Sequence, residues 1–278
     1  KAQVSANRIM EVLNTEPIIK SPKNGIKDTE NKGTIEFENV SFTYPNGEEP
    51  VIKDVSFSGK KGEVIAFIGS TGSGKSTLIN LIPRFYDVTK GSIKIDGVDV
   101  RDYDLKYLRK KIGFIPQKTL LFTGSIANNI KFGKKDAEYK EVEDSAKIAQ
   151  AYEFISNKPN KFDEIITEGG SNVSGGQKQR LSIARAIVRK PDIYIFDDSF
   201  SALDFKTDAI LRKELRSETK DAIVLIVAQR IGSIMDADKI IVLNEGEVVG
   251  IGTHKELIKN CHIYHEIATS QLTEEELA

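Results

Sequence analysis

The sequence of 278 residues has no tryptophan, one cysteine and two methionines. It also has no apolar run near the ~18 residues that a membrane-spanning helix needs. The single Cys261 excludes an intramolecular disulfide and favours a reducing compartment. Neither sign of charge is in excess, since 40 basic residues stand against 41 acidic ones, so no overall field draws the chain to nucleic acid or to an anionic membrane. No signal peptide is visible. Because the chain starts at Lys1 without a methionine, we expect a piece of a longer protein.

Short apolar runs predict the strands of a parallel sheet. The composition is that of an ordinary globular protein, with 39% hydrophobic and 29% charged residues, which excludes disordered and collagen-like chains. Continuous apolar runs at 64–68, 193–196 and 223–227 are typical of strands buried on both faces. Near alternation of apolar and polar residues at 34–42 instead predicts a strand with one buried face.

Turn residues and helical spacing complete the predicted architecture. Hairpins are predicted at 92–100, around an Asp-Gly pair, and at 240–249. Helical spacing of apolar residues occurs at 136–158 and 177–190. The sequence therefore predicts an α/β fold with a parallel core, an antiparallel portion near the start and a mostly helical insert.

A glycine-rich motif follows the first of the continuous apolar runs. It fits the pattern G-x-x-x-x-G-K-[ST], in which backbone N–H groups curl around phosphate oxygens and the next helix presents its positive end to the same anion. We expect Lys75 to reach the β- and γ-phosphates of a nucleotide and Ser76 to bind Mg²⁺. The alternative is a loop without a ligand. The motif comprises Gly69, Ser70, Thr71, Gly72, Ser73, Gly74, Lys75, Ser76 and Thr77.

A carboxylate stands at the end of another apolar run. Asp197 follows the run 193–196, and a carboxylate at the C-terminal end of a buried strand is suited to hold Mg²⁺ beside a phosphate loop. A strand-end aspartate can also serve as a helix cap. Together with the phosphate loop, Asp197 predicts a Mg-nucleotide site.

The order of the motifs resembles that of the ATP-binding cassette (ABC) proteins. Val173-Ser174-Gly175-Gly176-Gln177 is similar to the LSGGQ signature of that family. It lies between the phosphate loop and Asp197, as the family order requires, and the likeness covers about residues 33–270. The resemblance implies a P-loop NTPase fold of the ABC type, with a mixed, mainly parallel sheet core, an antiparallel β subdomain and a helical subdomain.

The resemblance also implies a domain organisation. Residues 1–32 resemble the linker from the membrane domain of an exporter, and 33–270 resemble the nucleotide-binding domain. The helical subdomain would lie at about 118–190. The acidic stretch 271–278 is expected to be a solvated tail.

Family roles can be carried over to matching residues. Tyr44 would stack on adenine, although a core aromatic is the alternative, and Val51 would pack under the nucleoside. Gln117 would contact Mg²⁺ or the attacking water and sense the membrane domain, although a solvated loop glutamine is possible. In the family two domains stand head to tail, and the signature of one closes on the γ-phosphate bound to the other. That role would fall to Ser174, Gly175, Gly176 and Gln177.

Two positions of the catalytic set depart from the family pattern. Asp198 stands where the family usually has the glutamate that polarises water, and its carboxylate is retracted by about 1.5 Å. A displacement of that size can reduce the rate on the order of 10²-fold. Gln229 stands where the family usually has a histidine, and an amide cannot carry positive charge. With Lys75 and Gln117, these residues form the expected catalytic set, which predicts ATP binding with slow hydrolysis.

The resemblance implies a motor domain of an exporter at the cytoplasmic face of the inner (cell) membrane. Its cofactors would be ATP and Mg²⁺. Its partners would be its own transmembrane domain with coupling helices, and a second nucleotide-binding domain, expected from a different subunit of a heterodimeric multidrug exporter. The alternatives are a nucleotide-gated clamp and an ordinary homodimeric ABC ATPase. A soluble ABC ATPase acting on DNA is a further reading, although no basic stripe supports a nucleic-acid partner.

Overall fold

The computed structural model describes residues 2–29 and 33–273. Its helices are α1 (Ala2–Asn14), α2 (Lys75–Leu81), α3 (Leu105–Lys110), α4 (Ile126–Lys131), α5 (Tyr139–Ile148), α6 (Tyr152–Ser156), α7 (Gly175–Ile187), α8 (Phe205–Glu218), α9 (His254–Asn260) and α10 (His262–Thr269). Its strands are β1 (Thr34–Phe42), β2 (Ile52–Lys60), β3 (Val64–Ile68), β4 (Lys90–Ile95), β5 (Val98–Asp99), β6 (Ile112–Ile115), β7 (Gly124–Ser125), β8 (Ile165–Ile166), β9 (Ile193–Asp197), β10 (Ile223–Val227), β11 (Lys239–Asn244) and β12 (Glu247–Gly252). Of the expected acidic tail at 271–278, residues 274–278 lie outside the described residues.

The central sheet has the strand order β12-β11-β3-β10-β9-β6. Its neighbours from β11 to β6 pair in parallel, and β12 pairs antiparallel with β11. Strands β9 and β10 are buried along their whole length, as their continuous apolar runs predict. Because these strands run in parallel, their carboxyl ends meet at one edge, where the polar residues that follow them gather.

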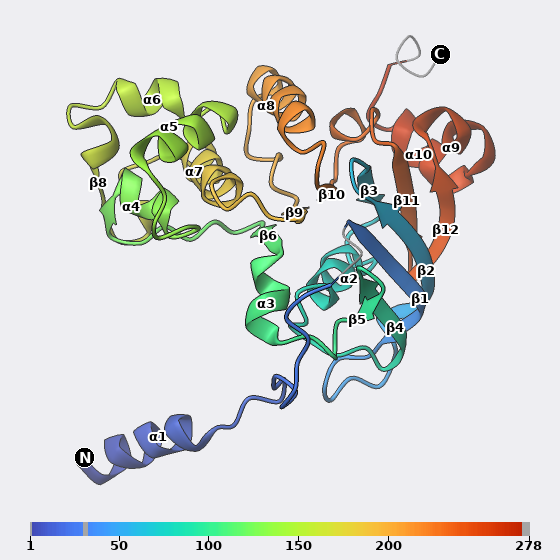
Figure 1. The fold of residues 1–278 in the computed structure, drawn as a ribbon. Helices are drawn as coiled ribbons and strands as arrows, with labels where there is room; N and C mark the ends of the chain where they lie inside the picture. The colour runs from blue at the N-terminus through green and yellow to red at the C-terminus, as the bar shows by residue number, and fades with distance from the viewer. Residues whose placement is uncertain (1, 30–32, 274–278) are drawn as a thin grey trace.

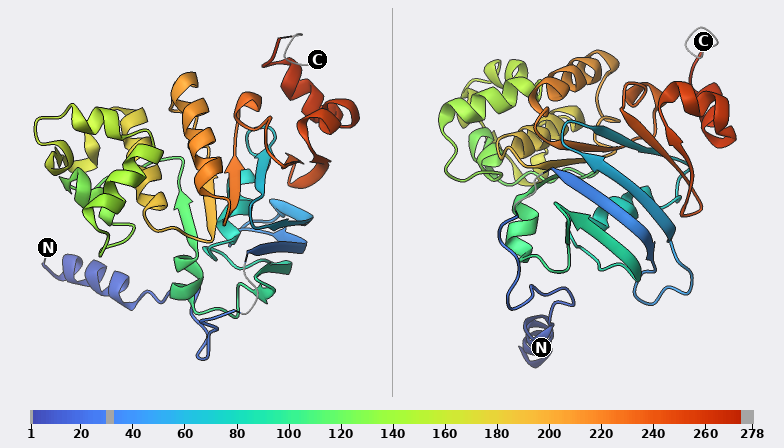
Figure 2. Two further views of the ribbon diagram at one scale, coloured as in Figure 1. Left: turned by 45° about the horizontal axis from the view of Figure 1, so that its top comes forward. Right: turned by 45° about the vertical axis from the view of Figure 1, so that its right-hand side comes forward.

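A second sheet, of order β2-β1-β4-β5, packs its apolar face on helix α2 and one face of the central sheet. The predicted hairpin joins β4 to β5 through Asp96 and Gly97, which both have positive φ. Strand β1 alternates only in part because its pairing with β2 shifts register between Phe37 and Val40. Figure 2 shows this sheet beside the central one.

The helices α4 to α7 gather at one end of the molecule, on the left of Figure 1. The helical spacing at 136–158 corresponds to two helices, α5 and α6, because the chain turns at 149–151, where Gln150 has φ 56°. The predicted helix at 177–190 instead spans Gly175–Ile187. It starts earlier because Ser174 caps its first turn.

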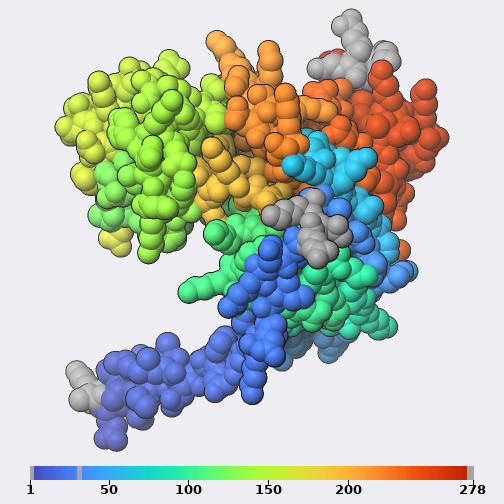
Figure 3. Space-filling view, viewed as in Figure 1, coloured from blue at the N-terminus to red at the C-terminus, as the bar shows by residue number. Residues whose placement is uncertain are grey.

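The amino-terminal segment has two parts. Helix α1 projects from the rest of the chain, and the space-filling view shows it as an arm (Figures 2 and 3). Residues 20–29 instead lie against the body of the protein, where Ile26 pairs with Tyr103 in a parallel bridge. Thr29, which is buried, donates to Asp96 at the β4–β5 turn.

Candidate nucleotide-binding site

The phosphate loop lies between the end of β3 and the start of α2, as predicted. Close packing requires glycine at Gly69, because a Cβ there would stand 2.0 Å from the carbonyl oxygen of Leu243. At Gly74 a Cβ would stand 2.7 Å from Ile52, and its φ of 98° belongs to the left-handed region. The surrounding chain therefore holds the loop in a conformation that requires glycine at these two positions.

The side chain of Lys75 turns back over this loop. Its Nζ donates to the carbonyl oxygens of Gly69 at 2.8 Å and Ser70 at 2.7 Å, and to the hydroxyl of Ser73 at 3.2 Å. Burial lowers the pKa of Lys75, and the carboxylates of Asp198 and Asp197 oppose that shift. A positive charge is thus positioned at the centre of the loop, where phosphate oxygens would complete its coordination.

Ser76 and Asp197 meet where α2 starts and β9 ends. The hydroxyl of Ser76 donates to Oδ1 of Asp197 at 2.8 Å. Burial raises the pKa of Asp197, whereas the Ser76 hydrogen bond lowers it. Within the described ranges no three His, Cys, Asp or Glu side chains form a metal-binding group. A hydroxyl and one carboxylate fit Mg²⁺, which keeps most of its ligands from water and substrate phosphates.

The two residues that depart from the family pattern, Asp198 and Gln229, are hydrogen-bonded to each other. Oδ2 of Asp198 accepts from Nε2 of Gln117 at 3.0 Å and from Nε2 of Gln229 at 2.7 Å. Gln117 follows β6 and Gln229 follows β10, so the ends of three adjacent strands converge on one oxygen. Burial raises the pKa of Asp198, and the hydrogen bond from Gln117 partly offsets this effect.

Sequence reasoning placed these three residues in one site but missed that they bond to each other. It noted Ser201 within the order of the family motifs but gave it no role; the Ser201 hydroxyl donates to the carbonyl oxygen of Asp198 at 2.8 Å. Asp198 has φ 48°, a conformation that non-glycine residues rarely adopt, and the Ser201 contact helps to hold it.

The aromatic residue Tyr44 reaches the loop from the second sheet. Its hydroxyl lies 2.9 Å from Oγ1 of Thr77. Its ring packs edge-on against those of Phe42 and Tyr86, with distances between ring centroids of 4.8 Å and 5.2 Å. The structure thus adds Tyr86, which the sequence did not single out. Val51 lies beside the loop through its backbone carbonyl, which would be 3.0 Å from a Cβ at Gly74.

The signature residues form the start of helix α7. Oγ of Ser174 accepts from the backbone N–H of Gln177 at 3.3 Å, and the Gln177 side chain accepts from the N–H of Ser174 at 3.1 Å. This reciprocal pair is a capping box. Ser174 and Gly175 are exposed, and nothing stands within 4 Å of a Cβ built at Gly175. Gly176 packs more closely, against the carbonyl oxygen of Ala202. The helix therefore presents its N-terminus to solvent.

Comparisons with known proteins identify the fold and the family of this chain. A family model described as ABC transporter matches residues 52–201. A solved structure of a bacterial Atm1-family ABC exporter with ATP bound superposes with a TM-score of 0.92 and 32% identity, over 98% of this chain and 47% of that one. The fold is thus that of an ABC cassette. In the described ranges, no helix has the length and apolar character needed to cross a membrane.

Curated relatives extend over a longer chain. The ABC transporter ATP-binding protein YfiB of Bacillus subtilis is 45% identical over 99% of this chain and 47% of its own length. The YgaD protein of Bacillus subtilis, named for multidrug export as an ATP-binding/permease protein, is 41% identical over 96% of this chain and 46% of its own. The chain spans about half the length of these relatives. Its sequence, its fold and its phosphate loop place this chain in the ABC transporter family as an ATP-binding domain.

Proposed function

We propose that this chain is the motor domain of an ABC exporter, which binds Mg-ATP and pairs head to tail with a second domain to drive transport. Support comes from the names of its relatives, which include multidrug export, and from the exporter that it resembles in structure. The domain would act at the cytoplasmic face of the cell membrane as part of a membrane-embedded transporter.

The site geometry supports a division of roles within one chain. Lys75 and the N–H groups of the loop would hold the phosphates, and Ser76 with Asp197 would hold Mg²⁺, which neutralises phosphate charge when bound. Tyr44, already beside Thr77, would stack on the base. Val51 would pack under the nucleoside from its place beside Gly74.

We further propose that hydrolysis at this chain's own site is slow, and the observation that carries this is the pair of amides on Asp198. A general base needs a free lone pair directed at the water that it activates. Here one carboxylate oxygen accepts two N–H groups, from Gln117 and Gln229, at 3.0 and 2.7 Å. The shorter aspartate side chain moves the remaining oxygen away from the phosphate, and neutral Gln229 adds no positive charge there.

The signature residues support faster hydrolysis of the ATP that is bound to the partner. Ser174, Gly175 and Gly176 keep the types that face phosphate in the family, and the exposed capped start of α7 is a ready anion site. The chain would therefore complete a competent site on a second, different subunit while its own site stays slow. Such an asymmetry favours a heterodimer over a pair of identical chains.

An apolar groove supports docking to a membrane domain. It lies between the end of β6 and helices α4 and α7, and its aromatic and aliphatic wall includes Leu120, Phe122 and Phe132, with exposures of 59%, 41% and 59%. The ring centroids of Phe122 and Phe132 lie 4.6 Å apart, and the guanidinium of Arg185 lies over both rings. Because Gln117 is close in sequence to this groove, a helix seated there could act on the Asp198 cluster.

The test is ATP turnover at saturating Mg-ATP by the wild-type chain and by Asp198→Glu/Gln229→His, with ATP binding measured in both. We expect low wild-type turnover and a gain of about 10²-fold or more in the double variant. Equal and substantial turnover would contradict the slow site and favour an ordinary homodimeric ATPase.

A second arm tests the partner. With a co-expressed partner that carries Glu and His at the two positions, Ser174→Ala is expected to reduce turnover of the assembly. Unchanged turnover would contradict the head-to-tail assignment. ATP binding with no turnover in any combination would favour a nucleotide-gated clamp.

A further inference from the structure

We propose that Arg84 is a positioning residue that joins residues 20–21 of the amino-terminal segment to the C-terminal end of helix α2. Docking of that segment and binding of nucleotide at the other end of α2 then favour each other. This inference rests on the proposed function, because it requires ATP at the phosphate loop. Neither Arg84 nor this segment belongs to the site described above.

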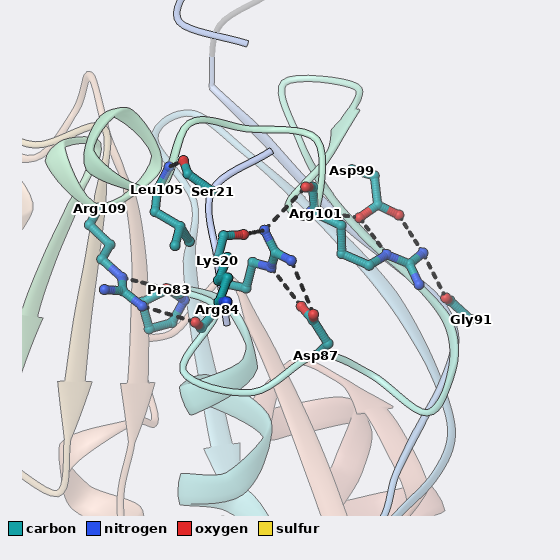
Figure 4. Close-up of polar contacts among 10 residues, drawn as sticks. All are labelled: Lys20, Ser21, Pro83, Arg84, Asp87, Gly91, Asp99, Arg101, Leu105 and Arg109. Atoms are coloured by element: carbon teal, nitrogen blue, oxygen red, sulfur yellow. Dashed lines mark hydrogen bonds and ion pairs between the residues drawn. The ribbon is translucent and has the colours of Figure 1, made fainter. Parts of the chain in front are cut away.

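Arg84 stands just after α2 and is 8% exposed. Its guanidinium donates to both carboxylate oxygens of Asp87, at 2.6 and 3.1 Å (Figure 4). Nη1 donates to the carbonyl oxygens of Lys20 at 3.3 Å and Arg101 at 3.1 Å. A planar fork of this kind fixes both position and direction, unlike a lysine ammonium. The backbone of Arg84 has φ 54°, which such surrounding contacts must hold in place.

Helix α3 supplies a second connection between the same two parts. The hydroxyl of Ser21 accepts from the backbone N–H of Leu105 at 2.8 Å, at the start of α3. Arg109, near the end of α3, donates from Nε to the carbonyl oxygen of Pro83 and from Nη2 to that of Arg84, both at 3.1 Å. Figure 4 shows that these contacts close a ring from the segment through α3 and the end of α2 and back to Lys20.

The segment is fixed on the body of the protein beyond this ring. The backbone of Ile26 donates to Asp102 at 2.9 Å and accepts from Asp104 at 3.0 Å. A Cβ at Gly25 would stand 2.5 Å from the backbone nitrogen of Asp104, so the two backbones are in close contact. Residues 20–26 therefore form a docked strap, whose release would break hydrogen bonds at both of its ends.

Helix α2 transmits a displacement because it is short and mostly buried. It spans Lys75–Leu81, about 10 Å. The backbone N–H groups of Arg84 and Phe85 donate back to the carbonyl oxygens of Leu81 and Asn80, so the Arg84 junction is tied to the end of the helix. A ligand that orders the phosphate loop orders α2, and an ordered α2 holds Arg84 against Lys20. By linkage, each event must favour the other by the same factor.

The experiment measures hydrogen exchange of the Ile26 amide with and without saturating Mg-ATP, because this amide reports opening of the strap. We expect ATP to slow its exchange at least about fivefold in the wild-type chain. Arg84→Gln is expected to lose this slowing while still binding ATP. Arg101→Gln is the matched control, since Arg101 forms the same fork with Asp99 but its side chain donates to Asp99 and to the carbonyl oxygen of Gly91 rather than to the strap, and it should keep the slowing.

Unchanged exchange in a wild-type chain that has bound ATP would overturn the inference and leave the proposed function intact. Equal slowing in the wild type and in Arg84→Gln would also overturn it. If Arg84→Gln does not fold, Arg84→Lys replaces it, because lysine keeps the charge without the fork; undiminished slowing would then count against the proposal. Failure of the wild type to bind ATP would instead overturn the proposed function, and this inference with it.

Discussion

The carboxylate of Asp198 is held where its ionised form is disfavoured. Burial raises its pKa above the ordinary 3.8, so the folded chain binds this proton more tightly than the unfolded chain does. The free energy of unfolding therefore falls as pH rises from the ordinary pKa through the raised one, and the penalty is complete above that window. The side chain thus reduces stability at neutral pH.

Replacing Asp198 by Asn removes that penalty while one amide oxygen can still accept from both glutamines. We expect Asp198→Asn to raise the Tm at pH 7.5 and to lose this advantage as pH falls through the raised pKa toward the ordinary one. Thermal unfolding followed by circular dichroism across pH gives the measurement. Asp221→Asn is the control, because the exposed Asp221 pairs with Lys61 and should gain nothing. A lower Tm for Asp198→Asn at neutral pH would contradict the argument.

Lys111, unlike Asp198, is a buried charged residue that has partners of opposite charge. Its Nζ lies 3.0 Å from Asp96, and the exposures of the two side chains are 6% and 1%. Burial opposes its charge, but hydrogen bonds to Asp192 and Asp96 raise its pKa. Sequence reasoning missed this cluster, because nothing in the local pattern shows that its residues meet.

Removing the ammonium leaves Asp96 as a buried charge without its counter-ion. We expect Lys111→Met to lower the free energy of unfolding by about 3–5 kcal/mol. Lys61→Met, which breaks an exposed and solvent-screened pair with Asp221, should lower it far less. Urea unfolding of both variants measures the difference. A loss below about 1 kcal/mol for Lys111→Met would count against the predicted role of the pair.

At the scale of elements, the sequence predicts strands better than helices. The strands β9 and β10 are covered on both faces. Because every side chain along them is buried, their sequences are continuous apolar runs, which can be recognised without the structure. The break between α5 and α6 has no comparable signal in the sequence. The residue with positive φ there is Gln150, at φ 56°, and not a glycine, and no proline interrupts the helical pattern. Tertiary packing of the buried Ala149 and Ala151 sets that turn.

The β4–β5 hairpin is a turn that its local sequence, Asp96-Gly97, is sufficient to predict. Gly97 has φ 77° and open space around it, so a side chain there would meet backbone strain rather than a clash. We expect Gly97→Ala to lower the free energy of unfolding by about 1–2 kcal/mol. Gly232→Ala, also in open space but without positive φ, should change it by no more than about 0.5 kcal/mol. Equal effects in chemical unfolding would show that the left-handed turn is not the cause.

At the scale of the whole molecule, the order of the motifs predicts which residues share a site, but their bonds depend on how strand ends converge. Gln117, Asp198 and Gln229 come from loops after three strands, and no local pattern states that they share one oxygen. The domain boundaries inferred from the resemblance, including a linker at 1–32, stay predictions. The docking of residues 20–29 was not foreseen, because several of its contacts, including those of Lys20 and Ile26, use backbone groups that leave no pattern in the sequence.

The proposed docking of a membrane domain in the apolar groove can be tested on the full-length protein. We expect Phe122→Ser/Phe132→Ser to reduce transport strongly while nucleotide affinity of this domain changes less than about twofold, since both rings stand away from the phosphate loop. Transport assays and ATP titration measure the two quantities. Val249→Ser/Ile251→Ser is the control, because these residues are similarly exposed, at 40% and 45%, on strand β12. Loss of transport in both variants would contradict a specific role for the groove.

The docked strap also determines where the folded unit can be cut. A fragment that began at residue 33 would remove the backbone partners of Asp102 and Asp104 and the carbonyl oxygen that Arg84 contacts. Fusion points, protease sites and affinity tags belong instead upstream of Lys20, between α1 and the strap. For protein engineering, the minimal cassette is thus longer at its amino end than its motifs alone would indicate.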